Sequence, residues 1–286
     1  MLKIERANFA LVRQALTDAF RLTKPFQRGN WQGLDIANKP EMAVHELLHV
    51  SIDVDLRGFT DLAWYRDMIK PNIPWADNHF EERVCGAPIN PGVEWANWPW
   101  GQSADKFREK GGIFNHNYME RYWPRYAGRV DMPTKTAEDW QDYMQVSSDN
   151  GRRIEQRHGI RGRYGDLSDV ITKLVREPTT RQAILPIYFP EDTAVIEGRQ
   201  PCSMYYHFLI DQNKRMDVVY PMRSCDFVRH WADDVYMTVR LLLWVIDNAK
   251  KGNAYFADVR PGRFVMHIAN SHMFRNDHLN IFGGPR

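Results

Sequence analysis

The sequence is poor in cysteine, and its few cysteines form no close pair. Cys85, Cys202 and Cys225 are an odd number, and no CxxC spacing occurs among them. Small secreted proteins held together by disulfides use even sets of cysteines, so this fold class is excluded and a reducing compartment is favoured. We therefore expect the protein in the cytoplasm.

Long hydrophobic runs and an excess of one charge are also missing. The longest apolar run, Leu241 to Ile246, is far shorter than the ~20 residues that span a bilayer, and residues 1–20 mix charged with apolar positions. We expect neither a signal peptide nor a membrane anchor. The chain has 38 basic and 36 acidic side chains, and the resulting net charge of +2 is too small for non-specific electrostatic binding to nucleic acid or membrane. An anionic partner is therefore expected to be a small molecule.

The composition is that of a folded globular protein. Hydrophobic residues make up 43% and charged residues 26% of the 286 positions, which excludes a disordered or coiled-coil chain. We expect a single domain over residues 1–286 with two excursions. One is an irregular stretch rich in proline and tryptophan, about residues 71–112, and the other is an arginine-rich loop, about residues 150–165. A solvated surface is the simplest interpretation of that loop.

Helical and strand patterns alternate along the rest of the chain. Apolar residues recur at helical spacing over residues 7–22 and alternate at strand spacing over residues 48–56, and a short helix is expected over residues 59–69. Further along, the patterns predict helices at 167–177 and 233–250 and strands at 183–189, 204–211, 215–222 and 263–270. This order predicts an α/β (α+β) fold.

The segment His45 to His49 has the HExxH pattern of zinc hydrolases. That mechanism needs a helix, which brings both histidines to one metal with the glutamate as base. The strand pattern begins within this segment, and at strand spacing residues four apart are ~13 Å from each other. We therefore expect no metal site here.

Cys202 precedes a predicted strand and has Arg199, Arg223 and Arg229 in the same half of the sequence. A thiolate needs positive charge nearby to exist at neutral pH, and it can then act as a nucleophile. A lone cysteine beside a strand is also a common small core residue, so the residues alone leave both interpretations open.

Several motifs, taken in order, resemble those of the thymidylate synthase superfamily. Gln200-Pro201-Cys202 stands before a strand, Met222-Arg223-Ser224-Cys225-Asp226 before a long helix, and HIANSHMFRNDH near the end of the chain. Upstream, Glu177 to Gln182 is similar to the family's arginine-bearing turn, and Asn115-His116-Asn117-Tyr118 to the segment with its active-site tyrosine. The resemblance covers roughly residues 10–280. It implies a large mixed, mainly antiparallel sheet flanked by helices.

The resemblance also implies an activity and a site. In this family a cysteine, here Cys202, adds to C6 of a pyrimidine nucleoside monophosphate, so that C5 can take a one-carbon unit from 5,10-methylenetetrahydrofolate. Tyr118 and Asp226 match the family's catalytic positions. The other matching residues are Arg28, Arg181, Arg223 and Ser224 for the phosphate, His272 for the sugar, and Trp100 with Asp226 for folate. A homodimer is implied, with Arg181 reaching the site of the partner.

Asp234 bears on which base is bound. It stands eleven residues after Arg223, where thymidylate synthases have an asparagine that reads uracil. A carboxyl group that accepts from N4 and, when protonated, donates to N3 suits cytosine. This position and the Met-Arg-Ser start resemble phage-type dCMP hydroxymethyltransferases, in which water ends the reaction, and a viral protein would act in the host cytoplasm. An aspartate near a helix start is also a favoured capping residue, so that interpretation stays open.

Departures from the family pattern leave further alternatives. The family's catalytic glutamate aligns best with Asp61, in a segment where Asp61, Trp64 and Tyr65 match, and Glu46 is a second candidate. The sugar-contacting tyrosine is replaced by Phe274, which leaves deoxyribose and ribose both open. The alternatives to dCMP hydroxymethylation are a thymidylate synthase, another C5-methyltransferase of dCMP or dUMP, and a non-catalytic nucleotide-binding relative.

Overall fold

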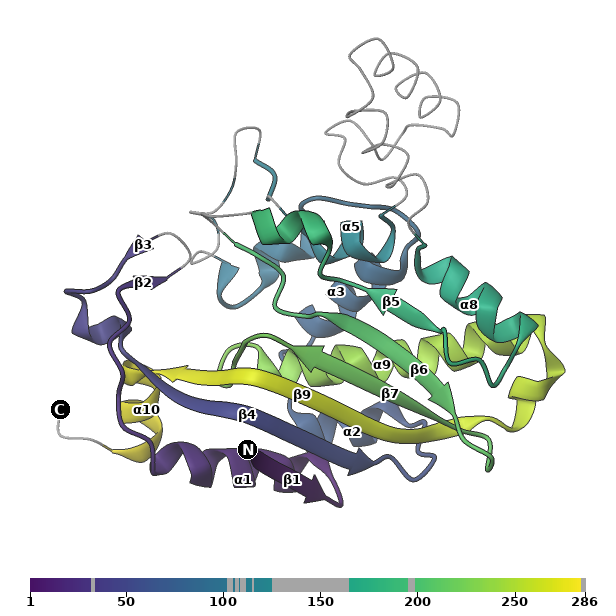
Figure 1. Cartoon of the computed structure of the whole chain (residues 1–286), viewed down its shortest axis with the longest axis horizontal. Coiled ribbons are helices and arrows are strands. Elements are labelled where there is room, and N and C mark those ends of the chain that lie inside the picture. The colour runs from purple at the N-terminus through teal and green to yellow at the C-terminus, as the bar shows by residue number, and fades with distance from the viewer. Residues whose placement is uncertain are drawn as a thin grey trace, which may run out of the picture.

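The computed structural model describes residues 1–31, 34–101, 105, 108, 112–114, 116–124, 165–194 and 199–283. Its centre is a mixed sheet, which the described residues build from seven strands in the order β1-β4-β9-β7-β6-β5, with β8 also paired to β9 (Figure 1). The strands are β1 Leu2–Arg6, β4 Val44–Asp55, β5 Ile184–Pro186, β6 Tyr205–Ile210, β7 Arg215–Met222, β8 Cys225–Asp226 and β9 Arg260–Phe274. A separate small ribbon pairs β2 Asn30–Trp31 with β3 Leu34–Asp35.

Two long strands form the middle of the sheet. β4 and β9 run antiparallel from Val44 opposite Phe274 to Asp55 opposite Arg263, and β7 lies parallel to β9 on its other side. Alternate side chains of β4 and β7 are buried, as expected for strands with one face against a core. Leu48 departs from the predicted alternation and is exposed. The left-handed backbone of His49, with φ 56°, lies between Leu48 and Val50 and interrupts the pattern there.

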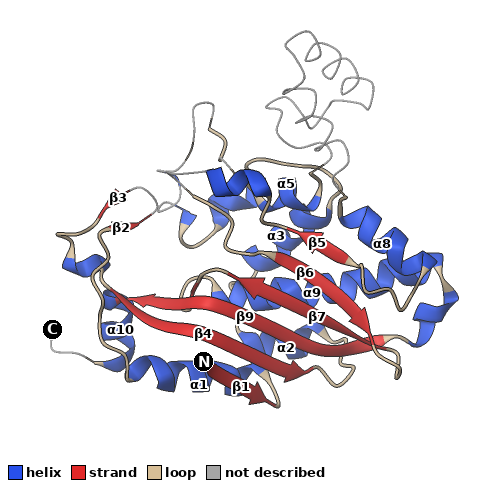
Figure 2. Cartoon of the chain, viewed as in Figure 1, coloured by secondary structure: helices blue, strands red, loops and turns tan. Residues whose placement is uncertain are grey.

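Helices cover one face of this sheet. Figure 1 shows α2, α3 and α9 behind the strands, and no helix of the described chain crosses the front of the sheet (Figure 2). The helices are α1 Phe9–Arg21, α2 Leu62–Ile69, α3 Trp75–Val84, α5 Tyr118–Tyr122, α8 Leu167–Arg176, α9 Trp231–Gly252 and α10 Arg275–Phe282. Short 3-10 turns are η1 Pro40–Met42, η2 Val93–Asn97, η4 Pro190–Ala194 and η5 Ala254–Asp258. Among the described residues, none of these helices has the length and apolar character needed to cross a membrane.

The predicted fold class is confirmed: the protein is a mixed α/β fold with a large sheet flanked by helices. Several elements were not predicted, and the one that matters most for the cavity is helix α3, which residues 75–84 form inside the stretch expected to be irregular. The prolines that suggested irregularity, Pro71, Pro74, Pro88 and Pro91, all lie outside the helix, where they do not interrupt its hydrogen bonds. The arginine-rich residues 150–164 lie outside the described residues.

Candidate active site

A cavity of about 460 Å³ lies where β4, β8 and β9 meet α3, α5 and the start of α9. The nucleophile candidate Cys202 is one of its lining residues. The predicted site residues that line it are Arg28, Tyr118, Cys202, Arg223, Ser224, Asp226, Asp234 and His272. Residues far apart in the sequence are thus brought together around one space, as an active site requires.

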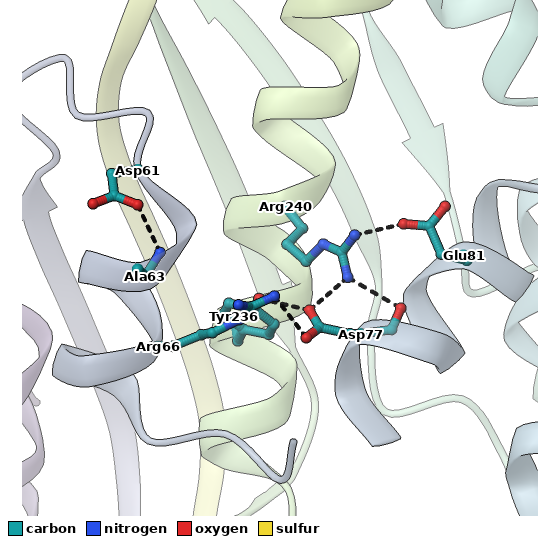
Figure 3. A network of polar contacts seen from close by, with 7 residues as sticks. All are labelled: Asp61, Ala63, Arg66, Asp77, Glu81, Tyr236 and Arg240. Atoms are coloured by element: carbon teal, nitrogen blue, oxygen red, sulfur yellow. Dashed lines mark hydrogen bonds and ion pairs between the residues drawn. The ribbon is translucent and has the colours of Figure 1, made fainter. Parts of the chain in front are cut away.

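Three predicted residues lie elsewhere. Asp61 is exposed at the N-cap of α2, where its carboxylate accepts a hydrogen bond from the backbone N–H of Ala63 at 2.8 Å (Figure 3). Arg181 is exposed just before β5, and its backbone oxygen lies 3.0 Å from a ring nitrogen of His207. Trp100 lies beside the cavity, with its ring centroid 5.2 Å from the guanidinium of Arg229. Asn115, from the motif around the tyrosine, lies outside the described residues.

Glu46 is the carboxylate that the fold brings into the cavity in place of Asp61. Its oxygens accept hydrogen bonds from Arg28 Nη2 at 2.7 and 2.9 Å and from Asn270 Nδ2 at 3.0 Å. The neighbouring His45 is buried instead against α10, where its ring stacks on His278 at 3.7 Å. Residues of the HExxH motif therefore face different surroundings on strand β4. In the described part of the chain no cluster of potential metal ligands was found.

Arg223 fixes the loop that carries Cys202. Its guanidinium donates to the backbone oxygens of Pro201 and Gln200, each at 2.8 Å, and its own N–H donates to the oxygen of Cys202 at 2.9 Å. Burial raises the pKa of the Cys202 thiol, and the positive charge of Arg223 opposes this only in part. Cys202 is therefore held in place as a thiol.

A chain of three hydroxyl groups begins at Tyr118. The hydroxyl of Tyr118 lies 3.0 Å from Ser203 Oγ, which lies 2.6 Å from the hydroxyl of Tyr220. Tyr220 is buried and has no other hydrogen-bond partner among the described residues. Its hydroxyl proton therefore has an acceptor only if Tyr220 donates to Ser203, and Ser203 then donates to Tyr118. The remaining proton is then that of Tyr118, which lines the cavity. Burial raises the pKa of Tyr118, so this proton is retained at neutral pH.

Asp234 occupies the first turn of α9 without capping it. The helix begins at Trp231, and its N-cap residue His230 makes no side-chain cap bond. The carboxyl of Asp234 has no hydrogen-bond partner among the described residues, whereas that of Asp233 binds Asn72 through two bonds of 2.8 Å. Burial raises the pKa of Asp234 to about 7, with Arg83 opposing and Asp233 adding to the effect. Near neutral pH this carboxyl is therefore both a donor and an acceptor.

Asp226, Ser224 and His272 form the wall beside β8. The Asp226 carboxylate accepts from the backbone N–H of Val228 and of Arg229, each at 3.0 Å, which fixes the turn into α9. Ser224 Oγ lies 3.3 Å from His272 Nδ1. Burial lowers the pKa of His272, so its ring is neutral at neutral pH.

Helix α3 supplies cavity residues that the sequence patterns did not reveal. Trp75, His79 and Arg83 follow one another at intervals of four, so they share one face of the helix, and all three line the cavity. The buried guanidinium of Arg83 lies 4.3 Å from the ring centroid of Tyr118. This interval of four was the available signal, but the flanking prolines obscured it.

Asp77 anchors α3 from its other side (Figure 3). Its carboxylate accepts from Arg66 Nη2 of α2 at 2.7 Å, and from the Tyr236 hydroxyl at 2.7 Å and Arg240 Nη1 at 2.8 Å, both of α9. Arg240 also donates to Glu81 at 2.5 Å. The face of α3 that lines the cavity is thus held relative to the helix that carries Asp234.

Much of the chain that forms this cavity is similar in sequence to thymidylate synthases. A family model described as thymidylate synthase matches residues 94–281, a range that includes Tyr118, Cys202 and Asp234 but begins after α3. A thymidylate synthase of Rhodopseudomonas palustris (strain BisA53) is 23% identical over 187 residues, which cover 65% of this chain and 55% of that protein. The chain therefore spans about half the length of this curated relative.

Proposed function

Because the chain belongs to the thymidylate synthase family, we propose that it transfers a one-carbon unit to C5 of a pyrimidine nucleoside monophosphate, and that it hydroxymethylates dCMP. The observation that carries the choice of base is the carboxyl of Asp234, which lines the same cavity as Cys202 and has no hydrogen-bond partner among the described residues. A buried polar group without a partner is costly, so a ligand that binds it gains affinity and specificity.

Cys202 is the proposed nucleophile. C5 of a pyrimidine is unreactive until a nucleophile adds to C6, and the cavity brings the sulfur of Cys202 beside several groups suited to hold the nucleotide. Arg223 and Ser224 would hold the phosphate, since the planar guanidinium matches phosphate oxygens. Arg28 lies on the same cavity wall, although Glu46 already binds it. Such anchoring of the phosphate orients C6 against the sulfur and contributes to the rate.

Asp234 is the proposed reader of the base. When protonated, its carboxyl donates to N3 of cytosine and accepts from the N4 amino group. A protonated carboxyl can also pair with uracil, by donating to O4 and accepting from N3. The similarity to a protein named thymidylate synthase therefore keeps dUMP methylation as the second candidate function.

The cavity also offers surfaces suited to folate. Trp75, Trp95 and Trp98 line it, and the indole N–H groups of Trp95 and Trp98 are buried without a hydrogen-bond partner among the described residues. Flat aromatic walls with free donors fit a flat heterocycle that carries acceptor atoms. When bound, 5,10-methylenetetrahydrofolate supplies the one-carbon unit. Asp226 lines the same cavity, and Trp100 lies next to it by packing against Arg229, which is also a lining residue.

The front of the sheet, which no described helix covers, supports a homodimer. Ile184 and Tyr205 point to this face from β5 and β6, and they are 40% and 37% exposed. A sheet with one open face and exposed apolar side chains is suited to pack against a second copy. Arg181 lies just before β5 and is exposed. By the family resemblance, we expect it to reach the phosphate site of the partner in such a dimer.

Release of tritium from [5-³H]dCMP, with [5-³H]dUMP in parallel and methylenetetrahydrofolate present, tests the proposal, with mass analysis of each product. We expect release from dCMP and a product heavier by CH₂O, and we expect Cys202→Ser to abolish release while dCMP still binds. A gain of CH₂ would indicate methylation instead. Release from dUMP alone would exclude the role of Asp234 as a cytosine reader, and binding of dCMP without release would indicate a non-catalytic relative.

A further inference from the structure

Helix α3 presents a histidine and a carboxylate to each other at the edge of the cavity. His79 Nδ1 lies 3.1 Å from Glu82 Oε2, and the side chain of His79 is almost completely buried while lining the cavity. Because a carboxylate can only accept, Nδ1 carries the proton of a neutral imidazole and Nε2 presents a lone pair. Among the described residues, Nε2 has no hydrogen-bond partner.

Glu82 is fixed independently of the histidine. Its Oε1 accepts from the backbone N–H of Glu94 at 2.9 Å, and a side chain at Gly92 would collide with its carboxylate. Burial favours the protonated acid, but the hydrogen bonds from His79 and from the backbone of Glu94 and Val93 outweigh it and hold the pKa of Glu82 below its usual value. The carboxylate is therefore ionised and oriented before any ligand binds.

The ring of His79 is held in one orientation. It stacks on Trp75 with the ring centroids 4.8 Å apart and an angle of 18° between the planes, and Trp95 lies edge-on at 6.5 Å. Burial, helped by the charge of Arg83, lowers the pKa of His79 to about 4, although Glu82 and Glu94 act in the opposite direction. The imidazole is thus neutral at neutral pH.

From this geometry we propose that His79 is the catalytic base that takes the proton from the water ending the reaction, and that Glu82 is the positioning residue that orients it. This inference rests on the proposed hydroxymethylation, because a hydride transfer would need no such base. A histidine fixed by a carboxylate on one nitrogen and open on the other is the arrangement used for general-base catalysis.

The proposed step balances without a further reactant. After transfer of the one-carbon unit and loss of the C5 proton, the nucleotide carries a methylene double-bonded to C5 while Cys202 is bonded to C6. The water oxygen bonds to the methylene carbon and its proton passes to His79 Nε2. The electrons of the methylene double bond form C5=C6, the C6–S bond breaks, and Cys202 leaves as a thiolate that the imidazolium can reprotonate.

Other cavity groups are less suited to this role. Glu46 is engaged by Arg28 and Asn270, and Tyr118 is oriented as a donor by Ser203. His272 binds the hydroxyl of Ser224 rather than a carboxylate. His79 therefore combines a free acceptor nitrogen with a fixed carboxylate partner.

A single-turnover experiment with enzyme in excess over [5-³H]dCMP separates this step from the earlier ones, because tritium leaves before water adds. For His79→Gln we expect tritium release within about 3-fold of wild type and formation of 5-hydroxymethyl-dCMP at least about 100-fold slower, the usual scale of general-base catalysis. With substrate in excess, release should stop after one equivalent per site, since the covalent nucleotide remains bound. Added 2-mercaptoethanol should then trap the methylene as a thioether.

Glu82→Gln is the second variant, since its amide keeps the shape of the side chain and still accepts from Glu94. It should slow product formation by about 10-fold with release unchanged, because His79 loses its ionised partner. His278→Gln is the matched control, since His278 is a helix histidine that does not line the cavity and lies on α10, where its ring stacks on His45 and Nε2 lies 3.2 Å from the backbone oxygen of Phe20. We expect it to match wild type in both measurements.

The outcomes separate the two proposals. If wild type makes no hydroxymethyl product, the proposed function fails and the role of His79 fails with it. If wild type makes the product, but release and product formation fall together in His79→Gln and Glu82→Gln, or neither falls, then His79 is a structural residue and only this inference is overturned.

Discussion

Arg28 and Glu46 form a two-pronged ion pair on the wall of the cavity, with Arg28 Nη2 at 2.7 and 2.9 Å from the two carboxylate oxygens. One partner was predicted to hold the phosphate and the other was the second candidate for the catalytic carboxylate. A phosphate bound to Arg28, as proposed, would compete with Glu46 for the donors of Arg28, while Asn270 still donates to Glu46 at 3.0 Å. In the proposed enzyme, nucleotide binding would thus change the number of hydrogen bonds that Glu46 accepts.

Separate substitution of the two candidate carboxylates, Glu46 and Asp61, distinguishes their roles. We expect Glu46→Gln to lower turnover of the nucleotide by at least about 100-fold, because proton transfer at the site loses its carboxylate. Asp61→Ala removes a helix cap and should cost about 1 kcal/mol of unfolding free energy with turnover unchanged. Steady-state kinetics and urea unfolding of both variants check this. A loss of turnover confined to Asp61→Ala would restore the assignment made from the sequence.

Asp234→Asn should change the base that is used. The amide lacks the titratable proton of the carboxyl and matches the residue with which thymidylate synthases read uracil, so the ratio of kcat/KM for dCMP over dUMP should fall by at least about 10-fold. Competition between the two labelled nucleotides in one reaction measures the ratio directly. An unchanged ratio would mean that Asp234 does not contact the base.

The same variant should alter the dependence of stability on pH. The pKa of Asp234 rises on folding from its ordinary value of 3.8 to about 7, so the folded state favours the protonated carboxyl. Its contribution is therefore most favourable below about pH 4 and is lost as the pH rises toward 7. Between these pH values wild type should lose roughly 2 to 4 kcal/mol relative to Asp234→Asn in urea unfolding. A constant difference would show that the carboxyl is not buried as described.

The hydroxyl chain predicts opposite effects of two substitutions on stability. Ser203→Ala leaves the buried hydroxyl of Tyr220 without a partner, which should cost about 1–3 kcal/mol of unfolding free energy. Adding Tyr220→Phe removes that hydroxyl and should recover part of the loss, but turnover should stay about 10-fold below wild type because Tyr118 remains unoriented. Full recovery of turnover in the double variant would mean that Ser203 acts only on stability.

The three cysteines should react at different rates. Cys85 is exposed, whereas burial raises the pKa of Cys202 and places the pKa of Cys225 well above its ordinary value. Alkylation by iodoacetamide near pH 7.5, followed by peptide mass spectrometry, should modify Cys85 first and Cys202 about 10-fold more slowly, and Cys225 only after unfolding. Fastest modification of Cys202 would show that it rests as a thiolate.

Much of the fold followed from periodicity in the sequence. The pattern over residues 7–22 became α1 Phe9–Arg21, the strand predicted over residues 215–222 became β7 Arg215–Met222, and the apolar run in the long helix became the buried face of α9. These elements have one face against the core, so burial alone imposes a period on their sequence. The pairing of β1 with β4 did not follow, because a parallel contact between distant segments leaves no local pattern.

Candidate site residues could be predicted from the sequence only where they belong to a recognisable motif. Cys202 and Asp234 were predicted because neighbouring residues carried the resemblance, and both line the cavity. Asp61 was chosen over Glu46 by sequence similarity, and only the path of β4 brings Glu46 to Arg28. His79 carries no motif, because its role depends on Glu82 one helical turn away and on a cavity formed by other elements.

The close contact between Gly92 and Glu82 limits which residues position 92 can accept. Glu82 fills the volume that a side chain at position 92 would need, and its carboxylate is held there by the backbone of η2. A side chain at position 92 would therefore displace the Glu82 carboxylate from its hydrogen bonds with His79 and with the backbone of Glu94. Related chains that keep the glutamate in this orientation should therefore keep glycine at position 92.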